Sequence, residues 1–393
     1  MYSGSTVFTQ IIKHAPKRRF QSLVKKYKGD HNTHKFSCWD QFLCMSFAQL
    51  TYRNGLRDIE ACLNAQPQKL YHMGIHGNPS RSNLSHANQN RDWRIYADFA
   101  QVLISEARQL YQNEQPFSVD LDNTVYALDS STIDLCLSLF PWAKFRKKKG
   151  AVKIHTLLDV RGSIPSCIFI TDGLTHDVTL LDEFVYEPGA YYVMDKAYVD
   201  FKRLYRIHKH LSYFVIRAKN NFDYKRLYSA KISEATGVCS DQTIRADGIR
   251  TREYYPENLR RIRFHDKETG NYFVFLTNNF KLPAALIAEL YKNRWKIELF
   301  FKWIKQHLKI KKFFGNSFNA VKTQIWIAIS IYVIVAIIKK KYRVEASLYI
   351  MLQIISISLF EKTDLVELLN TRPKSLATDP HNGQISLFDY LDH

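Results

Sequence analysis

The chain has 393 residues, 46% of them hydrophobic and 14% aromatic, so it is long enough to bury a core and is not a disordered protein. Its formal net charge of +19 favours a polyanionic partner, with nucleic acid as the first candidate and an anionic membrane surface as the alternative. The six cysteines include no C-x-x-C pair, and residues 1–20 include no apolar stretch followed by a cleavage site. We therefore expect a reducing, cytoplasmic compartment and no export.

Residues 1–115 have the pattern of short helices. The sequence predicts one helix from Cys38, a break at Asn54-Gly55 and a second helix after the break. Further on, Pro79 and the polar residues after it could open another helix. Short helices joined by tight turns are typical of helix-turn-helix proteins that read the major groove of DNA. A bundle whose polar side chains only face solvent has the same pattern, so DNA binding by this region depends mainly on the total charge.

His31, His34 and Cys38 are close enough in the sequence to suggest a zinc site. A fourth ligand would have to come from Cys44, which lies inside the predicted helix, whereas structural zinc sites use closely spaced ligand pairs. We therefore interpret these residues as ordinary buried or surface side chains.

From about residue 122 the pattern changes to strands separated by turn residues. Asp129 follows the β-rich run VYAL and Asp195 follows the apolar run YYVM, so each aspartate is predicted to end a strand. Further along, strands alternate with helices, which indicates an α/β core with a mixed sheet. In such sheets, sites form at the carboxyl ends of strands. Asp134 is the alternative strand-end acid, and we prefer Asp129 because it ends a cleaner strand.

Residues from about 212 to 280 form an all-β stretch, in which the run ETGN is predicted to be a hairpin turn. We interpret this stretch as an insertion into the α/β domain. Pro283 then begins a long helical region. The apolar run Ile325–Ile338 is shorter than the roughly 18–20 residues that a bilayer span needs, so we expect a buried core helix.

The helical segment Tyr291–Lys312 carries eight Lys and Arg residues but a single acid, Glu298. In an ideal helix of about 100° per residue, three residues share the face of this acid: Tyr291, Arg294 and Lys305. Lys302 flanks the same face. The simplest interpretation is a surface i,i+4 ion pair between Glu298 and Arg294 or Lys302, which is worth a few tenths of a kcal/mol.

The two strand-end aspartates favour a different interpretation. Asp129 and Asp195 from neighbouring strands, together with Glu298 from a packed helix, could hold two Mg²⁺ ions, because hard cations prefer carboxylate oxygens. Two metal ions about 3.5–4 Å apart activate the attacking oxygen and stabilise the leaving oxygen in phosphoryl transfer. The cations of the helix would then hold an anionic strand. The residues therefore predict a metal-dependent phosphoryl-transfer site.

The helix matches the spacing Y-x2-R-x3-E-x6-K in full, with Tyr291, Arg294, Glu298 and Lys305. This spacing resembles the signature of the DDE transposases of the insertion-sequence-four family, in its Y-R-E-K subgroup. The runs ALDSSTIDL and VMDKAYVDF resemble the blocks that carry the first and second aspartates of that family. The N-terminal region resembles the helical domain that precedes the catalytic core in one branch. The resemblance covers most of residues 1 to about 340.

The resemblance implies an α/β (α+β) fold with an RNase H-like catalytic core, interrupted by a β-rich insertion and preceded by a helical N-terminal DNA-binding domain. The expected boundaries are 1–115 for the N-terminal domain, 120–211 and 283–340 for the two parts of the core, 212–282 for the insertion and 341–393 for a C-terminal helical region and tail.

The resemblance also assigns roles to the signature residues. In that family three carboxylates bind divalent metal, which makes Asp129, Asp195 and Glu298 the catalytic metal ligands here, with Mg²⁺ as the cofactor and Mn²⁺ as a substitute. In the family, the Tyr, Arg and Lys of the signature contact the DNA backbone close to the cut. The resemblance therefore gives this role to Tyr291, Arg294 and Lys305.

Members of the family cut the 3′ ends of their element with water and use the freed 3′-OH to attack other strands. The resemblance therefore implies double-stranded DNA as the partner, both the terminal inverted repeats of an insertion sequence and the target. It also implies a homodimer in the synaptic complex and a bacterial, nucleoid-associated protein in the cytoplasm.

The basic run Lys144–Lys153 lies between the first two predicted strands. With a DNA substrate, three of its lysines are predicted to contact phosphates: Lys147, Lys148 and Lys149. Lys302 on the long helix is given the same role. Such contacts position a duplex without reading its sequence.

Some roles stay open at this point. Family members stack a flipped base on an aromatic side chain, often from the insertion, and three tyrosines there are equal candidates: Tyr254, Tyr255 and Tyr272. Asp159 and Asp172 flank predicted turns, where aspartates commonly bond their own backbone, so both are left out of the site.

Three other functions fit parts of the sequence. A different RNase H-like nuclease, such as a junction resolvase, would use the same carboxylates without strand transfer. A non-catalytic DNA-binding regulator descended from a transposase would keep the fold alone. A basic membrane-associated protein would depend on the apolar run Ile325–Ile338.

Overall fold

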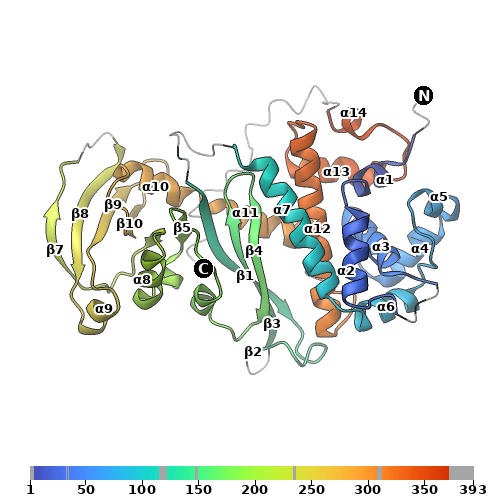
Figure 1. Cartoon of the computed structure of the whole chain (residues 1–393), viewed down its shortest axis with the longest axis horizontal. Coiled ribbons are helices and arrows are strands. Elements are labelled where there is room, and N and C mark those ends of the chain that lie inside the picture. The colour runs from blue at the N-terminus through green and yellow to red at the C-terminus, as the bar shows by residue number, and fades with distance from the viewer. Residues whose placement is uncertain are drawn as a thin grey trace. The chain divides into compact units, whose positions relative to one another are not determined.

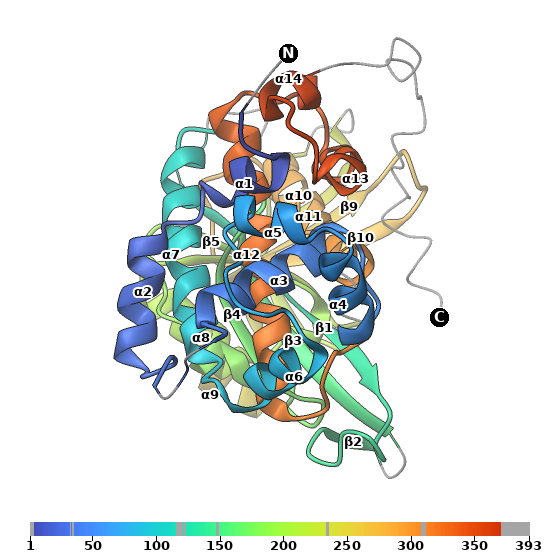
Figure 2. The same cartoon turned by 90° about the vertical axis from the view of Figure 1, so that its right-hand side faces the viewer.

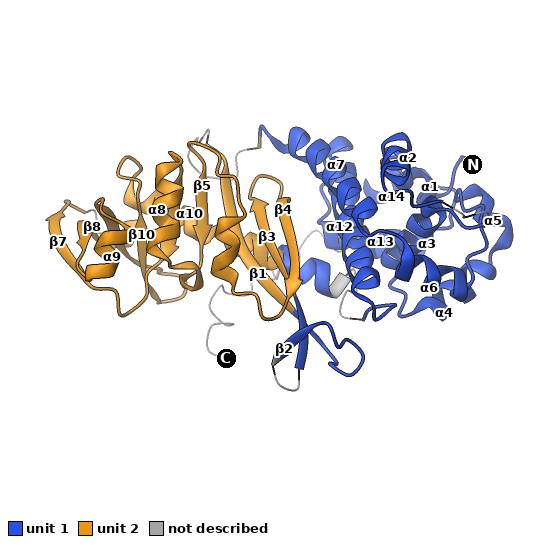
Figure 3. Cartoon of the chain, turned by 60° about the horizontal axis from the view of Figure 1, so that its bottom comes forward, with its two compact units in different colours: residues 1–113, 133–152, 300–379 blue, residues 114–132, 153–299, 380–393 orange. Residues whose placement is uncertain are grey.

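The computed structural model describes residues 4–31, 33, 35–114, 121, 123–146, 149–232, 236–307 and 312–370. The chain divides into two compact units, which have different colours in Figure 3. Unit 1 comprises residues 1–113, 133–152 and 300–379, and unit 2 comprises residues 114–132, 153–299 and 380–393. Each unit is therefore built from segments that are far apart in the sequence. The division into five consecutive segments stays a prediction.

Unit 1 is mainly helical, and the helical pattern predicted for residues 1–115 is confirmed for the described residues. Seven helices in the described part of this region are joined by three from the C-terminal part of the chain. They are α1 (Val7–Ile12), α2 (Lys17–Lys26), α3 (Cys38–Leu50), α4 (Leu56–Asn64), α5 (Pro67–His72), α6 (Arg81–Asn90), α7 (Arg94–Tyr111), α12 (Phe318–Lys341), α13 (Leu348–Ser358) and α14 (Leu365–Asn370).

Helix α3 is buried along its whole length and begins with a capping box. The hydroxyl of Ser37 accepts a hydrogen bond from the N–H of Asp40, and the Asp40 carboxylate accepts one from the N–H of Ser37. The other oxygen of this carboxylate accepts hydrogen bonds from the backbone N–H groups of His76 and Gly77. The acid thus fixes both the start of α3 and a distant loop. The predicted break at Asn54-Gly55 is confirmed, because α4 starts at Leu56.

The zinc interpretation gains no support. Cys38 and Cys44 are both buried, and burial raises the pKa of each thiol, which opposes the thiolate that a metal needs. His34 lies outside the described residues.

Helix α12 is the one helix in the described part of the chain that is long and apolar enough to cross a membrane, by length and composition. Within its most apolar window, 94% of the residues are buried inside the protein. It packs along α7 and also contacts α3 and α6 (Figure 1). The Tyr111 hydroxyl of α7 donates a hydrogen bond of 2.9 Å to the carbonyl of Ala336. The prediction that Ile325–Ile338 is a buried core helix is confirmed.

Most of a mixed sheet lies in unit 2, as predicted, and the part of it within residues 133–152 is grouped with unit 1. The strands in the described residues are β1 (Val125–Leu135), β2 (Lys144–Arg146), β3 (Lys149–Asp159), β4 (Ile164–Asp172), β5 (Tyr191–Met194), β6 (Tyr213–Arg217), β7 (Tyr224–Ser229), β8 (Val238–Ala246), β9 (Leu259–His265) and β10 (Tyr272–Thr277). Their order is β2-β3-β1-β5-β6-β10-β9-β8-β7, and β4 pairs with β3. β1, β5 and β6 are parallel, and β10 is antiparallel to β6.

Helices cover both faces of this sheet (Figure 1). They are α8 (Phe201–Lys209), α9 (Ile249–Tyr254), α10 (Ala284–Lys292) and α11 (Trp295–Lys302), the last of which crosses the boundary into unit 1. On one face, Leu128 and Met194 belong to a buried cluster with Leu204 of α8. On the other face, Tyr291 of α10 contacts Phe275, with 4.7 Å between ring centroids. Successive residues of a strand therefore point towards different helices.

The predicted β-rich stretch is confirmed as strands that continue the central sheet. The turn at ETGN is also confirmed, because Tyr272 pairs with His265 across it and Gly270 has a φ of 73°. One part of the prediction is wrong: Arg252 and Tyr254 lie in helix α9 rather than in a strand. Tyr255, which follows this helix, is fully buried in the core, and such packing overrides the local β preference of tyrosine.

Strand β7 is an edge of the sheet and pairs with β8 alone among the described strands. Most of its residues are exposed, including the cations Lys225 and Arg226. Leu227 and Tyr228 are exposed as well, by 45% and 63%. This edge combines unpaired backbone groups with apolar and basic side chains.

Candidate active site

The two predicted aspartates lie side by side at the same edge of paired strands. Leu128 of β1 is in register with Met194 of β5, and the next residues are Asp129 and Asp195. Because Leu128 and Met194 point into the cluster under α8, alternation directs the aspartates to the opposite face, where α10 packs. The sequence was wrong in one respect: β1 does not end at Asp129 but continues to Leu135. Only its parallel pairing with β5 ends there.

The predicted continuous helix around Glu298 is also wrong. α10 ends at Lys292 and α11 begins at Trp295, so Arg294 lies in a turn between them. The N–H of Arg294 donates to the carbonyl of Tyr291, and the N–H of Ile297 donates to the carbonyl of Arg294, both in the tight i to i−3 pattern. A π-helical turn, Trp303–His307, follows α11. The single arc predicted from an ideal helix therefore does not describe these residues.

Arg294 nevertheless joins two of the three predicted acids. Its Nη1 donates a hydrogen bond of 2.9 Å to Asp129 Oδ2, and its Nη2 donates one of 2.6 Å to Glu298 Oε1. The hydroxyl of Tyr291 lies 3.4 Å from Asp195 Oδ1, to which it donates. Arg294 is 5% exposed, so these ion pairs are formed largely out of water. The structure thus brings five predicted site residues of unit 2 together.

The charges of this cluster influence one another. Burial raises the pKa of Asp129 to about 6, and the like charges of Glu298 and Asp195 add to this, although Arg294 opposes it. Burial would lower the pKa of Arg294, but Tyr291 and the three carboxylates raise it above its usual range. Arg294 therefore stays charged and holds together acids that would otherwise repel one another.

The chemistry of these residues fits a divalent cation. Three ionised carboxylates and one guanidinium leave a formal charge of −2, and hard cations such as Mg²⁺ prefer carboxylate oxygens. Among the described residues, however, no group of three His, Cys, Asp or Glu is arranged to hold a metal ion. Arg294 occupies the space between Asp129 and Glu298, which explains why the acids do not converge. Asp129, Asp195 and Glu298 therefore stay the predicted metal ligands.

The other predicted DNA contacts either are grouped with unit 1 or lie outside the described residues. Lys302 is exposed and Lys305 is half-buried, and both belong to residues grouped with unit 1. Lys149 is exposed in β3, whereas Lys147 and Lys148 lie outside the described residues. Their roles stay predictions.

The sequence offered one alternative ligand, Asp134, and left two turn aspartates out of the site, Asp159 and Asp172. Asp134 is exposed near the end of β1, in residues that group with unit 1. Asp159 accepts hydrogen bonds from the N–H and side chain of Arg161, and Asp172 accepts them from the N–H groups of Leu174 and Thr175. The expectation that both acids bond their own turns is confirmed.

Sequence reasoning missed two residues beside Asp129. The N–H of Ser130 donates a hydrogen bond of 2.7 Å to Asp129 Oδ1. Tyr198, three residues after Asp195, is 1% exposed, and burial together with nearby acids, Asp129 first, raises its pKa. The spacing of Tyr198 after an aspartate at a strand end is the one sequence signal that could have indicated it.

A second cluster of polar side chains lies on β3, β4 and the helical turn after β4. His155 is fully buried, its Nε2 is 2.9 Å from the Thr171 hydroxyl, and its Nδ1 is 3.6 Å from Asp177. Lys153 donates a hydrogen bond of 3.1 Å to the same carboxylate. Burial lowers the pKa of His155 to about 4, which Lys153 favours and Asp177 opposes. This histidine is therefore neutral at physiological pH.

We expect His155 to make the protein less stable in mild acid. Its pKa is about 4 when folded and near 6.5 when unfolded, so the unfolded state binds more protons and stability falls as the pH drops through this window. Between pH 7 and pH 5 the loss that His155 contributes is about 2 kcal/mol, measured by urea unfolding as the difference between wild type and His155→Gln, because the raised pKa of Asp129 acts in the opposite direction in both proteins. The change His155→Gln should remove most of this loss, while the same change at the exposed His176 should not. Equal pH slopes for wild type and His155→Gln would contradict this account.

Comparison with known proteins identifies the family. A family model described as the transposase DDE domain matches residues 120–334, more than half of the chain. The chain belongs to the DDE transposase family. Members of this family cleave DNA, so DNA cleavage is the class of reaction and DNA is a partner. They generally use divalent metal ions. The mixed sheet of this DDE transposase fits the RNase H-like core that was expected.

Several relatives agree with this membership. The DDE transposase is 31% identical, over 75% of its chain and 82% of the relative, to a protein of Sinorhizobium fredii (strain NBRC 101917 / NGR234) whose name describes it as a transposase, y4zB. It is 30% identical, over 53% of its chain and 54% of the relative, to a transposase named for insertion sequence element IS5377 of Geobacillus stearothermophilus. It is 26% identical, over 65% of its chain and 71% of the relative, to one named for element IS4SA of Synechocystis sp. (strain ATCC 27184 / PCC 6803 / Kazusa).

Two further matches complete the comparison. Residues 3–76 of the DDE transposase match a family model described as a domain of unknown function, DUF4372. A solved structure of a piggyBac transposase synaptic complex with hairpin DNA covers 94% of this chain and 81% of its own, with 12% identity and a TM-score of 0.43.

Proposed function

We propose that this DDE transposase cleaves and joins DNA at the terminal inverted repeats of an insertion sequence, with Asp129, Asp195 and Glu298 as its metal ligands. The observation that supports this most directly is the bridge from Arg294 to Asp129 and Glu298, with Tyr291 at Asp195. Ionisable groups whose pKa values are shifted by burial and by one another's charges cluster at functional sites, and Asp129 and Arg294 are two such groups.

Each residue of the cluster has a role in this mechanism. Asp129, Asp195 and Glu298 would hold divalent ions, whose chemistry when bound would be to activate the attacking oxygen and to stabilise the leaving oxygen. In the first step, a water oxygen bonds to phosphorus while the bond to the 3′ oxygen breaks, which frees a 3′-OH and releases a proton to solvent. In the second, the oxygen of this 3′-OH bonds to the phosphorus of a phosphodiester in another strand while the bond from that phosphorus to its own 3′ oxygen breaks. The attacking hydroxyl loses its proton to solvent, and the leaving oxygen takes up a proton and becomes a 3′-OH. Arg294, which bridges Asp129 and Glu298 here, would donate to a DNA phosphate if those acids held a cation, and Tyr291 orients Asp195 through its hydroxyl.

The finer assignment to the Y-R-E-K subgroup of the insertion-sequence-four family belongs to this proposal. In it, Lys305 joins Tyr291 and Arg294 at the DNA backbone near the cut, and other phosphates are contacted by Lys302, Lys147, Lys148 and Lys149. The metal is Mg²⁺, with Mn²⁺ as a substitute. Two copies pair two element ends, and the enzyme works on the nucleoid in the bacterial cytoplasm.

A base-stacking residue in the insertion is also part of the proposal. Tyr255 is fully buried and packs within 5.4 Å of the Tyr205 ring, so it has no face to offer a base. Tyr254 and Tyr272 are 44% and 56% exposed, and the role falls to one of these two.

The test is to incubate the protein with Mg²⁺ and a duplex that contains the ends flanking its gene, and then to map 3′-OH termini and joined products. We expect metal-dependent 3′ cuts at the ends, followed by joining to a second duplex. Cuts without joined products would indicate a nuclease of the same fold, and binding without any cut would indicate a regulator. Either result would contradict the proposed function.

A further inference from the structure

Helix α6 of unit 1 has an outward face made of polar residues without a single acid. Its exposed residues are Arg81, Ser82, Ser85, His86, Gln89 and Asn90. Of the helices that pack against it, α4 includes Asp58 and Glu60, and the Glu60 carboxylate accepts a hydrogen bond from the N–H of Arg81, whereas α12 has no acid. A helix face that only meets water usually mixes both charges, whereas a face that meets a polyanion excludes acids.

The other side of α6 is fixed firmly to the unit. Leu84, Ala87 and Asn88 are buried against α3, α4 and α12, and Figure 2 shows α6 in front of α12. The side-chain carbonyl of Asn88 accepts a hydrogen bond of 2.7 Å from the side-chain amide of Gln41. The main-chain carbonyl of Asn88 accepts one from the side-chain amide of Asn319. At the other end, Ser80 caps the helix. A rigid seat of this kind suits a helix that presents side chains to a fixed surface.

The outward side chains are not used within the protein. Within the described part of the chain, Ser85, His86 and Gln89 have no hydrogen-bond or ion-pair partner. They lie at i, i+1 and i+4, so they share one side of the helix. Hydroxyl, imidazole and amide groups are the kinds of donor and acceptor that read base edges in the major groove.

A basic groove runs beside α6. A cavity of about 530 Å³ is lined by the C-terminal half of α6 and by the segment after α2, which contributes the exposed Lys28 and Lys35. Neither lysine has an ion-pair partner among the described residues. The one acid of the groove, Asp92, is paired with Arg94 at 2.6 Å. The free charge of the groove is therefore positive.

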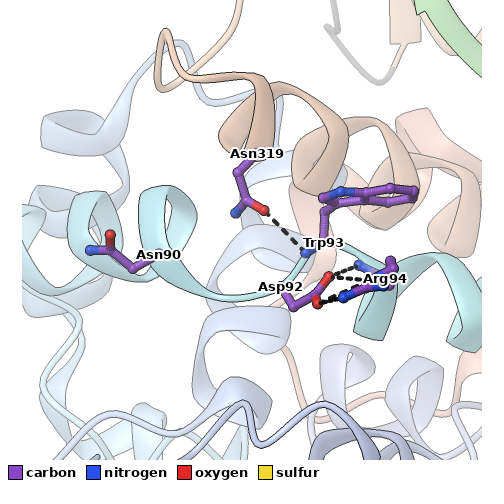
Figure 4. Close-up of a pocket in the computed structure, with 5 residues that line it drawn as sticks. All are labelled: Asn90, Asp92, Trp93, Arg94 and Asn319. Carbon is purple, nitrogen blue, oxygen red and sulfur yellow. Dashed lines mark hydrogen bonds and ion pairs between the residues drawn. The ribbon is translucent and has the colours of Figure 1, made fainter.

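Figure 4 shows how this groove continues past the end of α6. A second cavity of about 430 Å³ shares Asn90 and Asp92 with the first and also contains Trp93 and Asn319. The Asn319 side chain accepts a hydrogen bond from the N–H of Trp93, which holds α12 against the turn before α7. The two cavities border the C-terminal end of α6, and Asp92 is the one acid among the described residues that line them.

We propose that α6 is the helix that reads the element ends: it enters the major groove of duplex DNA, where Ser85, His86 and Gln89 contact base edges while Lys28 and Lys35 contact the adjacent phosphates. This assignment rests on the proposed function. It gives a DNA-binding role both to residues 3–76, which contribute Lys28 and Lys35, and to α6, which follows them. The helix supplies specificity and the groove supplies sequence-independent affinity.

The test selects duplexes with a random central sequence on the full-length protein in Ca²⁺ and sequences the retained pool. Wild type is expected to enrich one motif, and the triple variant Ser85→Ala, His86→Ala, Gln89→Ala is expected to lose it. The matched control removes exposed residues of α7 with similar chemistry, Gln101→Ala, Ser105→Ala and Gln109→Ala, and should enrich the wild-type motif. Enrichment of that motif by the α6 variant, or of none by wild type, would overturn the proposal.

Affinity measurements separate the two parts of the surface. By fluorescence anisotropy, the α6 variant should bind the enriched duplex at least about tenfold more weakly and a shuffled duplex as wild type does. The variant Lys28→Gln, Lys35→Gln should weaken binding to both and lower the slope of log K against log salt by about 2. If the α6 triple variant is unfolded by circular dichroism, Gln89→Ala alone must still change the preferred base at one position. An unchanged motif for a folded Gln89→Ala protein overturns the proposal.

This outcome is distinct from that of the proposed function. Metal-dependent cutting and joining by wild type without any enriched motif would remove the role of α6 and leave the transposase mechanism standing. An enriched motif that depends on α6 without cutting would do the reverse.

Discussion

The change Asp129→Asn is expected to lower DNA cleavage by about a thousandfold or more, and Glu298→Gln to do the same. Metal ions contribute several kcal/mol of transition-state stabilisation, and each 1.36 kcal/mol corresponds to a factor of ten in rate. Both changes keep the size of the side chain and remove one anionic ligand. The measurement is the rate of 3′-end cutting of end-containing duplex in Mg²⁺, with calorimetric Mn²⁺ binding to the same proteins as a second readout.

The matched control is Asp134→Asn, which removes an exposed acid from the same strand. It should cut at the wild-type rate and bind Mn²⁺ as wild type does. If Asp129→Asn cut at full rate, or if Asp134→Asn were as defective as Asp129→Asn, the assignment of the ligands would be wrong. A loss of cutting with unchanged metal binding would point to a structural role for Asp129.

The second large effect is expected from Arg294→Gln. Without metal, this change leaves Asp129 and Glu298 facing each other without the guanidinium that joins them. Loss of one partner of a buried ion pair costs about 3–5 kcal/mol, and because Glu298 is 45% exposed we expect about 2–4 kcal/mol. The melting temperature in EDTA should fall by several degrees. Mn²⁺ should recover most of this loss, because it can neutralise the same acids.

Another buried pair in unit 2 offers the control. Arg260 donates hydrogen bonds of 2.8 and 2.7 Å to the Asp241 carboxylate. Neither residue is a predicted metal ligand. Arg260→Gln should therefore lower the melting temperature in EDTA without recovery in Mn²⁺. Equal recovery of both variants, or none of Arg294→Gln, would mean that the acids around Arg294 do not bind metal.

The sequence was sufficient to find the acids because their positions depend on local patterns. Asp129 and Asp195 follow apolar β-rich runs, and two parallel neighbours bring such residues to one edge. It also offered the i,i+4 pair of Arg294 with Glu298 as one interpretation, which is confirmed, but it did not indicate that Arg294 also reaches Asp129 and so bridges the two acids. The bridge depends on the turn at Asn293 and Arg294, where hydrogen bonds from residue i to residue i−3 replace the i to i−4 bonds of an α-helix. The sequence did not indicate this turn, because the residues there are all compatible with a helix.

Other features depended on packing that no local pattern reveals. The run Ile325–Ile338 was correctly expected to be buried, but nothing in it indicates that α12 would pack along α7, more than 200 residues earlier. In the same way, Tyr254 and Tyr255 have equal β preferences, and only the contacts of Tyr255 with the core distinguish the buried residue from the exposed one.

The open edge at β7 has a consequence for how the protein can be handled. Its exposed Leu227 and Tyr228 would let a second molecule add a strand there, and Lys225 and Arg226 oppose this by repulsion between like charges. Repulsion of this kind is screened over about 10 Å at 0.1 M salt and over about 3 Å at 1 M. The high salt often used to strip nucleic acid from a basic protein thus weakens the protection of this edge, and colloidal stability is best at moderate ionic strength.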